Sequence, residues 1–153
     1  MKKVFSLCLI CLMALSAMAQ NSVWVDLGLP SGTLWKSTNE KGVYYTYDEA
    51  VSQFGDNLPS REQFIELKAF CTWEWNGKGY VVTGDNGNSI ILHAAGIRGC
   101  DGDVYGVGSF GFYWSSSPYD SDDAWLLGFY SDRVNMFNNY RCGGQSVRLV
   151  QNL

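Results

Sequence analysis

The second half of the chain contains neither lysine nor glutamate. The last glutamate is Glu74 and the last lysine is Lys78, and neither residue type occurs in the 75 positions from Gly79 to Leu153. Both types are among the commonest in proteins, so their joint absence constrains the fold. Strands and tight turns disfavour them, whereas Asp and Asn suit turns. We therefore expect strands and turns throughout this half of the chain.

The N-terminal residues have the pattern of an export signal. A positive start at Met1-Lys2-Lys3 precedes an apolar run from Val4 to Leu15, and Ala17-Met18-Ala19 has the small-x-small form of a cleavage site. The apolar run is shorter than the roughly 20 residues that cross a bilayer. We expect residues 1–19 to be a cleaved signal peptide and residues 20–153 to form one domain, located in the periplasm or at the cell surface.

The composition is that of a globular protein with an acidic surface. Hydrophobic residues make up 46% of the chain and aromatic residues 15%. The formal net charge is -4, and loss of Lys2 and Lys3 with the signal leaves nine basic residues against fifteen acidic ones. Because this charge repels phosphate, nucleic acids and anionic membrane surfaces are disfavoured as partners.

Two capping boxes predict two short helices. Thr46 and Glu49 have the Thr-x-x-Glu spacing, and the apolar residues that follow recur at helical intervals until Gly55. Ser60 and Gln63 repeat the pattern at the start of the second helix. The predicted buried stripe of the second helix is Phe64, Leu67 and Phe70 or Cys71.

Short β-prone stretches surround these helices. Turn residues and apolar alternation predict a hairpin in which Val23–Leu29 and Thr33–Trp35 flank Pro30-Ser31-Gly32. A second pair of strands is predicted at Trp73–Thr83 and Ser89–His93, on either side of the Asn-Gly turn in Gly84–Asn88. Single strands are predicted at Val43–Tyr45 and, closing the chain, at Ser146–Val150. In the closing strand, Val147 and Leu149 are expected to point inward.

Trp125–Asp132 alternates with a period of two. Trp125, Leu127 and Phe129 fall on one face, which we expect to be buried. The other face carries Leu126, Gly128, Tyr130 and Asp132, a mixed set where a plain solvated face would be charged and polar. This pattern is typical of a strand whose outer face is selected for contacts.

The segment after this strand is rich in Tyr, Arg and Asn, a mixture typical of adaptable recognition surfaces. An Asn-rich hairpin with incidental aromatic residues is the alternative that stays open. The candidate ligand-binding residues are Tyr119, Asp120, Asp122, Asp123, Leu126, Gly128, Tyr130, Asp132, Arg133, Phe137, Tyr140 and Gly143.

Five segments of the chain point to one family. They are Val25–Trp35, Leu58–Phe64, Asn88–Gly96, Tyr113–Ser117 and Ser146–Val150. On these segments the chain resembles the Fibrobacter succinogenes major paralogous domain, which occurs in many exported Bacteroidetes proteins. That family is similar to the C-type-lectin-like fold of formylglycine-generating enzymes and of variable proteins diversified by retroelements.

The resemblance implies an α+β domain with a C-type-lectin-like fold. Two short helices would pack on twisted antiparallel sheets, the terminal strands would pair, and the C-terminal part would build the ligand face. In the diversified proteins, randomised adenines in AAC or AAT codons forbid Lys, Glu, Gln, Trp and Met at exchanged positions. The candidate residues and Cys142 are permitted types, whereas Trp125 and Met136 are forbidden types that we assign to the invariant scaffold. The resemblance thus implies a surface diversified by a retroelement.

The chain shows no catalytic or metal-binding pattern. His93 is the only histidine, and no nucleophile or carboxylate is placed beside it in the sequence. Asp101–Gly106 begins like a calcium loop, but Tyr105 and Phe112 stand where ligands belong, which excludes an EF-hand. We therefore predict no enzymatic activity, no cofactor and no metal.

Three cysteines remain after the signal, namely Cys71, Cys100 and Cys142. Their spacing matches no zinc or redox motif, and one disulfide among them is compatible with export. The pairing stays open.

We expect an exported, non-enzymatic binding domain whose partner is a protein or a glycan, without a membrane span after signal removal. Replacing Tyr130 and Arg133 by Ala is expected to abolish ligand capture and to leave the melting temperature nearly unchanged. One alternative is a structural or assembly subunit of the cell envelope, in which the same segment contacts a fixed protein partner. A remote alternative is a formylglycine-generating-like oxidase, although the three cysteines lack the close spacing of its copper site.

Overall fold

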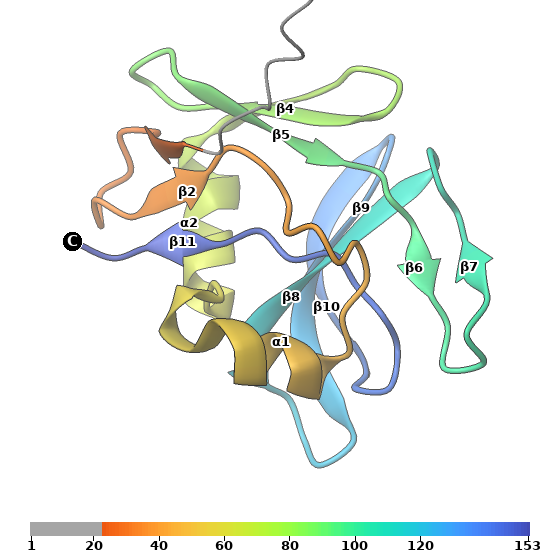
Figure 1. The fold of residues 1–153 in the computed structure, drawn as a ribbon. Helices are drawn as coiled ribbons and strands as arrows, with labels where there is room; N and C mark the ends of the chain where they lie inside the picture. The colour runs from red at the N-terminus through yellow and green to blue at the C-terminus, as the bar shows by residue number, and fades with distance from the viewer. Residues whose placement is uncertain (1–22) are drawn as a thin grey trace, which may run out of the picture.

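The computed structural model describes residues 23–153, so the predicted signal peptide lies outside the described residues. Two short helices pack beside several antiparallel sheets, and the predicted α+β class is confirmed (Figure 1). The helices are α1 (Tyr47–Phe54) and α2 (Arg61–Phe70), with the 3-10 turn η1 (Gly55–Asn57) after α1. In this part of the chain, neither helix has the length and apolar character needed to cross a bilayer.

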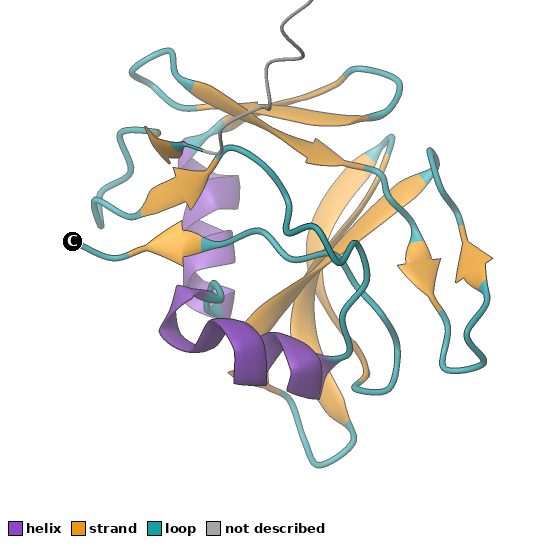
Figure 2. Cartoon of the chain, in the orientation of Figure 1, coloured by secondary structure: helices purple, strands orange, loops and turns teal. Residues whose placement is uncertain are grey.

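The strands form separate small sheets, shown in orange in Figure 2. The first sheet has the order β1-β2-β11 and consists of β1 (Trp24–Asp26), β2 (Leu34–Lys36) and β11 (Val150–Gln151). The second has the order β3-β4-β5 and consists of β3 (Thr72–Trp75), β4 (Gly79–Thr83) and β5 (Ser89–His93). The third has the order β10-β9-β8 and consists of β8 (Phe110–Pro118), β9 (Asp123–Tyr130) and β10 (Arg133–Tyr140). A two-stranded ribbon of β6 (Ile97–Arg98) and β7 (Val104–Tyr105) lies at its side (Figure 1).

The locally encoded features agree with the sequence. Both capping boxes form, with Thr46 and Glu49 at α1 and Ser60 and Gln63 at α2. The β1–β2 hairpin and the β4–β5 hairpin are also confirmed. In the β1–β2 turn, Gly32 adopts a φ of 74°, which a residue with a Cβ atom rarely adopts.

Two local expectations were wrong, and a third, which left Phe70 and Cys71 as alternatives, is settled in favour of Cys71. Val43–Tyr45 is not a strand, because Val43 adopts a φ of 62° and only Tyr45 forms a bridge, with Gln145. The expected strand Trp73–Thr83 is two strands, because Gly77 turns the chain with a φ of 91°. Phe70 is 51% exposed, so the α2 stripe is carried by Phe64 and Leu67, and Cys71 packs at its margin.

The β10-β9-β8 sheet separates two hydrophobic cores. Leu127 and Phe129 of β9 contribute to the larger core with Trp35, Phe64 and Leu67. The opposite face of β9 contributes Ala124 and Leu126 to a second core beneath α1. Both faces of this central strand are therefore covered over much of its length.

A buried polar network links the C-terminal segment to three sheets. Arg148 is 0% exposed, and its guanidinium donates to Asn39 Oδ1 through both Nε (2.8 Å) and Nη2 (2.6 Å). It also donates to the carbonyls of Lys36 and Ile91, at 3.1 and 2.6 Å. Asn39 Nδ2 in turn donates to the hydroxyl of Tyr113. Burial lowers the pKa of the Arg148 guanidinium and raises that of the Tyr113 hydroxyl.

This network corrects the expected closing strand. Strand pairing covers only Val150–Gln151 rather than the whole of Ser146–Val150. Val147 is buried as expected and Leu149 is half-buried, but Arg148 between them is buried as well. Period two fails here because the segment passes between packed elements rather than along one sheet face.

Candidate ligand-binding surface

The structure divides the predicted binding residues into three sets. Leu126, Gly128 and Gly143 are buried. Tyr130, Asp132 and Arg133 lie at the β9–β10 turn and Phe137 lies in the middle of β10, paired with Leu126. At the opposite end of the same strands lie Tyr119, Asp120, Asp122, Asp123 and Tyr140. The predicted segment is therefore one continuous hairpin with two separate exposed ends.

Leu126 belongs to a core rather than to a ligand surface, because its 0% exposed side chain is surrounded by other buried apolar side chains. It packs in the second core with Trp114, Ala124 and Val147. The alternation in β9 correctly separates two faces, but both faces are buried because β9 lies between β8 and β10 with a core on each side. Trp125 was also wrongly assigned to the core: it is half-buried and packs against Tyr119, with ring centroids 5.0 Å apart.

Replacing Leu126 by Ala should lower the free energy of unfolding by about 3 kcal/mol, because the substitution opens a cavity in a closed core. Urea denaturation followed by tryptophan fluorescence measures this loss. Tyr140→Ala is the control, since Tyr140 is 63% exposed and its loss should change stability by less than about 0.5 kcal/mol. Equal effects of the two substitutions would contradict the assignment of Leu126 to the core.

Gly128 is also buried, but it shapes a surface. A Cβ atom at Gly128 would overlap the rings of Phe112 and Phe137, so the missing side chain lets these rings cross the strand. Phe110, Phe112, Tyr130 and Phe137 are each half-buried, and neighbouring ring centroids lie 5.5 to 6.1 Å apart. We call these four residues the aromatic face. The Arg133 guanidinium lies 4.6 Å from the centroid of the Tyr130 ring.

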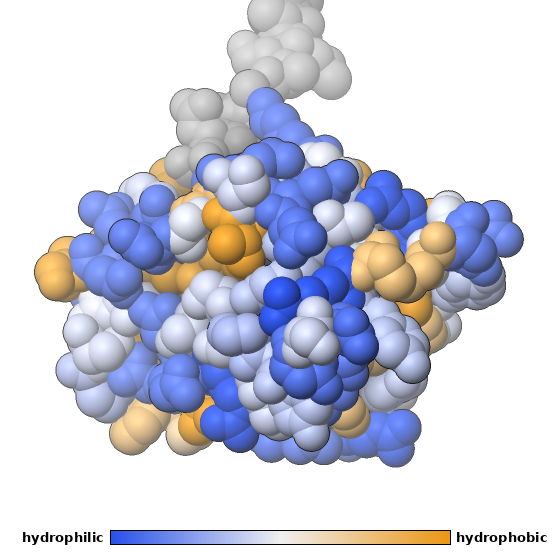
Figure 3. All heavy atoms as spheres, turned by 90° about the horizontal axis from the view of Figure 1, so that it is seen from below, coloured by the Kyte–Doolittle hydropathy of each residue, from blue (hydrophilic) through white to orange (hydrophobic). Residues whose placement is uncertain are grey.

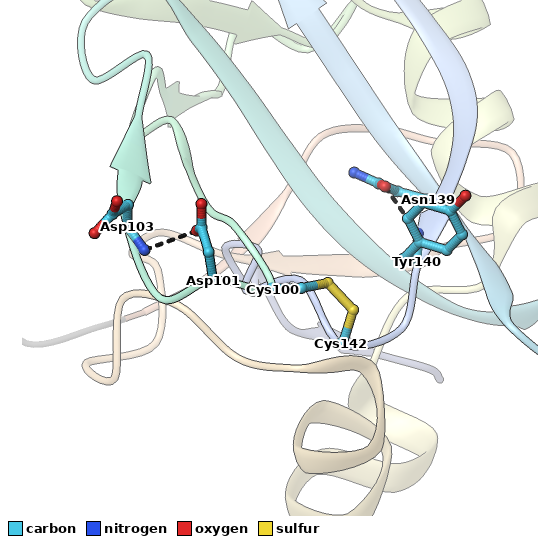
Figure 4. Close-up of a disulfide and its surroundings, with 6 residues drawn as sticks. All are labelled: Cys100, Asp101, Asp103, Asn139, Tyr140 and Cys142. Atoms are coloured by element: carbon cyan, nitrogen blue, oxygen red, sulfur yellow. Dashed lines mark hydrogen bonds between the residues drawn. A yellow bond between two sulfur atoms is a disulfide. The ribbon is translucent and has the colours of Figure 1, made fainter.

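The other end of the hairpin is fixed by a disulfide. Cys100 follows β6 and Cys142 follows β10, and their Cα atoms lie 5.2 Å apart (Figure 4). This settles the pairing that the sequence left open, and it makes Cys142 part of the scaffold rather than an exchanged position. Cys71 is the free cysteine of the described residues, and burial raises the pKa of its thiol to about 11, which keeps it protonated at neutral pH.

Arg141 holds the loop between β8 and β9 against α1. Its guanidinium donates to the carbonyls of Asp120 and Asp123 and lies 4.8 Å from the centroid of the Tyr47 ring. Asp120 accepts the backbone N–H groups of Asp122 and Asp123, which lower the pKa of its carboxyl group. Asp120 therefore shapes the loop although it is exposed, and Tyr119 and Asp122 are exposed beside it.

Two hollows adjoin the disulfide and share Tyr140 as a wall. The Gln145 hollow has a volume of about 320 Å³ and is lined by Ile97, Arg98, Cys100, Asp101, Gln145 and others. The Asp122 hollow has a volume of about 390 Å³ and is lined by Asp48, Ser121, Asp122, Arg141 and Cys142. In Figure 4, Tyr140 and Asn139 stand at the end of β10 near Cys142, and Asp101 lies beside Cys100.

The surface on the side of α1 and the β8–β9 loop is largely hydrophilic, with small separate hydrophobic patches (Figure 3). Exposed Tyr140 lines the Asp122 hollow together with the polar side chains of that hollow. Rigid amphipathic rings surrounded by polar side chains are typical of protein recognition surfaces. No group of three or more His, Cys, Asp or Glu side chains within residues 23–153 is arranged to hold a metal ion.

Residues 73–150 match the family described as a domain of unknown function, DUF8237. The chain belongs to this family. The DUF8237 match begins in β3 and ends at the first residue of β11, so it contains the aromatic face, the disulfide and the lining of the Gln145 hollow. Neither a curated protein nor a solved structure matches the chain.

Sequence reasoning missed Arg98 and Gln145, which line the Gln145 hollow. Arg98 reaches it because the Cys100–Cys142 bond and the pairing of Arg98 with Gly144 bring β6 to the end of β10. Gln145 is placed by its bridge to Tyr45, one hundred positions earlier in the chain. No local pattern encodes either contact, so only an explicit pairing of the two cysteines could have indicated this region.

Proposed function

We propose that this DUF8237 protein is an exported, non-enzymatic binding domain that recognises a protein or glycan through the exposed parts of the β8–β10 hairpins. The observation that carries the proposal is a set of aromatic and charged side chains displayed on a rigid backbone. Tyr140 and Asp122 lie near the disulfide, and Arg133 lies over the ring of Tyr130 in the aromatic face. Such preorganised aromatic and Arg anchors lower the entropic cost of binding.

The order of the elements supports the finer assignment to a C-type-lectin-like fold related to the Fibrobacter family. Both helices precede the C-terminal sheet, and β11 near the C-terminus pairs with β2 near the start of the described chain. Within this proposal, the exchangeable positions of a diversified surface are the half-buried Tyr130 and the exposed Tyr119, Asp122, Asp132, Arg133 and Tyr140. Leu126, Gly128 and Cys142 belong to the scaffold.

Replacing Tyr130 and Arg133 together by Ala should weaken ligand binding at least tenfold and lower the melting temperature by less than about 5 °C, because both side chains lie outside the cores. The probes are peptides selected from a random phage-displayed library on the purified protein, together with the sugars of a glycan array. A matched control is Ile65→Ala on α2, which removes an apolar side chain that is 40% exposed. Selected ligands that respond to Ile65→Ala and ignore the double substitution would overturn the proposed surface.

Sequencing the locus from a culture grown from a single cell tests the diversified surface separately. A near-copy of the codons for residues 114–148, differing only at adenines and lying beside a reverse transcriptase, is the expected finding. A locus without such a copy would contradict diversification and leave a fixed surface, as an envelope subunit with one protein partner would have.

A further inference from the structure

The side chain of Gln145 is buried without a hydrogen-bond partner. The residue is 0% exposed, and neither Oε1 nor Nε2 makes a hydrogen bond within residues 23–153. Its backbone is held firmly, because its N–H donates to the Tyr45 carbonyl and its carbonyl accepts from the Tyr45 N–H, both at 2.9 Å. A buried amide without a partner destabilises the folded state, and an apolar side chain of the same size would avoid this cost. The residue therefore points to a partner that the chain itself does not supply.

Gly143 lies against this amide, and its missing side chain leaves a small space lined by polar atoms. A Cβ atom built at Gly143 would lie 3.2 Å from Gln145 Nε2, 3.4 Å from the Tyr140 carbonyl oxygen and 3.7 Å from the Arg98 carbonyl oxygen. Each carbonyl accepts one backbone N–H, from Gly143 and Gly144 respectively, and keeps a second lone pair. Gly143 is not among the glycines with positive φ, so the backbone does not demand a glycine here. The absence of a side chain instead keeps a space bordered by one donor and two acceptors.

The walls of the Gln145 hollow suit a small ligand with an apolar side. The Tyr140 ring is exposed at one wall, and Ile97 and the disulfide add further apolar surface. Arg98 and Asp101 place opposite charges in the same lining, so neither sign of ligand charge is favoured overall. A volume of about 320 Å³ lies at the small end of ligand pockets and accommodates one sugar or one amino-acid residue.

We propose that the Gln145 hollow binds a secondary amide group. The ligand's carbonyl would accept a hydrogen bond from Gln145 Nε2, which is otherwise without an acceptor. The ligand's N–H points the opposite way in a trans amide, and it would donate to the spare lone pair of the Tyr140 or Arg98 carbonyl beside Gly143. A carboxylate would bring no donor to these two carbonyls, and an ammonium group would leave Nε2 without an acceptor. Because no hydrogen bond holds the Gln145 amide, it can rotate toward the entering ligand without breaking one. This inference rests on the proposed function, since the hollow is part of the same binding surface.

A secondary amide can come from an acetamido sugar or from a peptide backbone, and two probes distinguish these sources. The probes are N-acetylglucosamine, with glucose as its amide-free control, and N-acetylglycine N-methylamide. The readout is the side-chain NH₂ resonance of Gln145 in a ¹⁵N-correlated NMR spectrum of the purified protein. At least one probe should shift this resonance with saturation, at a Kd on the order of 1 mM for ligands of this size. If neither probe moves it, or if glucose moves it equally, the inference is overturned.

Two substitutions test the subsite directly. Gln145→Leu should raise the melting temperature or leave it unchanged, because it removes two unpaired polar atoms, and it should weaken probe binding at least tenfold. Gly143→Ala should also weaken binding, because its methyl group fills the space beside Nε2. Ser121→Ala in the neighbouring Asp122 hollow is the control and should leave probe binding unchanged.

These variants separate the two proposals. If Gln145→Leu leaves probe binding intact while Tyr130→Ala with Arg133→Ala still abolishes capture of the selected ligands, the amide subsite is wrong and the binding surface stands. If the probes bind at Gln145 but the selected ligands ignore the whole β8–β10 surface, the subsite stands and the proposed function is wrong.

Discussion

Replacing Arg148 by Met should lower the free energy of unfolding by about 4 kcal/mol. Met keeps much of the apolar stem, but it leaves Asn39 Oδ1 and the carbonyls of Lys36 and Ile91 without their donors. Each orphaned buried acceptor costs about 1–3 kcal/mol, and the regained apolar packing offsets only part of the sum. Urea denaturation followed by circular dichroism measures the loss.

Arg133→Met is the matched control, because Arg133 is exposed and its contact is a cation–π pair with Tyr130. We expect the control to change stability by less than about 0.5 kcal/mol. Buried ion pairs can often be replaced by apolar residues at little cost, because both charges are removed together. Arg148 differs, since its acceptors are neutral groups of other segments that remain in place. A loss below about 1 kcal/mol for Arg148→Met would show that these acceptors find other partners.

The features that the sequence predicted are those encoded within a few positions. The capping boxes at Thr46 and Ser60 need only a side chain and a backbone group three residues apart. The Asn-Gly turn between β4 and β5 is equally local. All the residues that form each cap or turn are close together in the sequence, so the helices and hairpins could be predicted from it.

The features that the sequence did not predict depend on distant segments. The alternation of β9 reveals two faces, but whether Leu126 faces solvent or α1 depends on how α1 packs. Arg148 looks like an exposed residue of a strand until Asn39, from the segment after β2, and Ile91, from β5, are brought to it. The same reason explains the candidate site: exposed Tyr140 and Arg133 could be predicted from composition, whereas Gln145 could not.

Replacing both Cys100 and Cys142 by Ala should lower the free energy of unfolding by about 4 kcal/mol, because the unfolded chain gains conformational entropy when the crosslink is removed. The bond joins positions 42 residues apart, and a loop of this length gives about 4 kcal/mol in the chain-entropy estimate. Both cysteines are exposed, so little packing is lost with their sulfur atoms. For a domain of this size, the melting temperature should fall by roughly 15 °C, which differential scanning calorimetry measures.

Cys71→Ala is the control, since it removes a half-buried thiol without opening a loop and should cost about 1 kcal/mol or less. Dithiothreitol should destabilise the unsubstituted protein by a similar amount and leave the double variant unchanged. A double variant as stable as the unsubstituted chain would contradict a structural role for the bond.

Because Cys100 and Cys142 line the two hollows, the folded double variant should also bind amide probes more weakly, even well below its melting temperature. The disulfide would then serve the binding surface as well as the fold, since it holds β6 against the end of β10 where Gln145 lies.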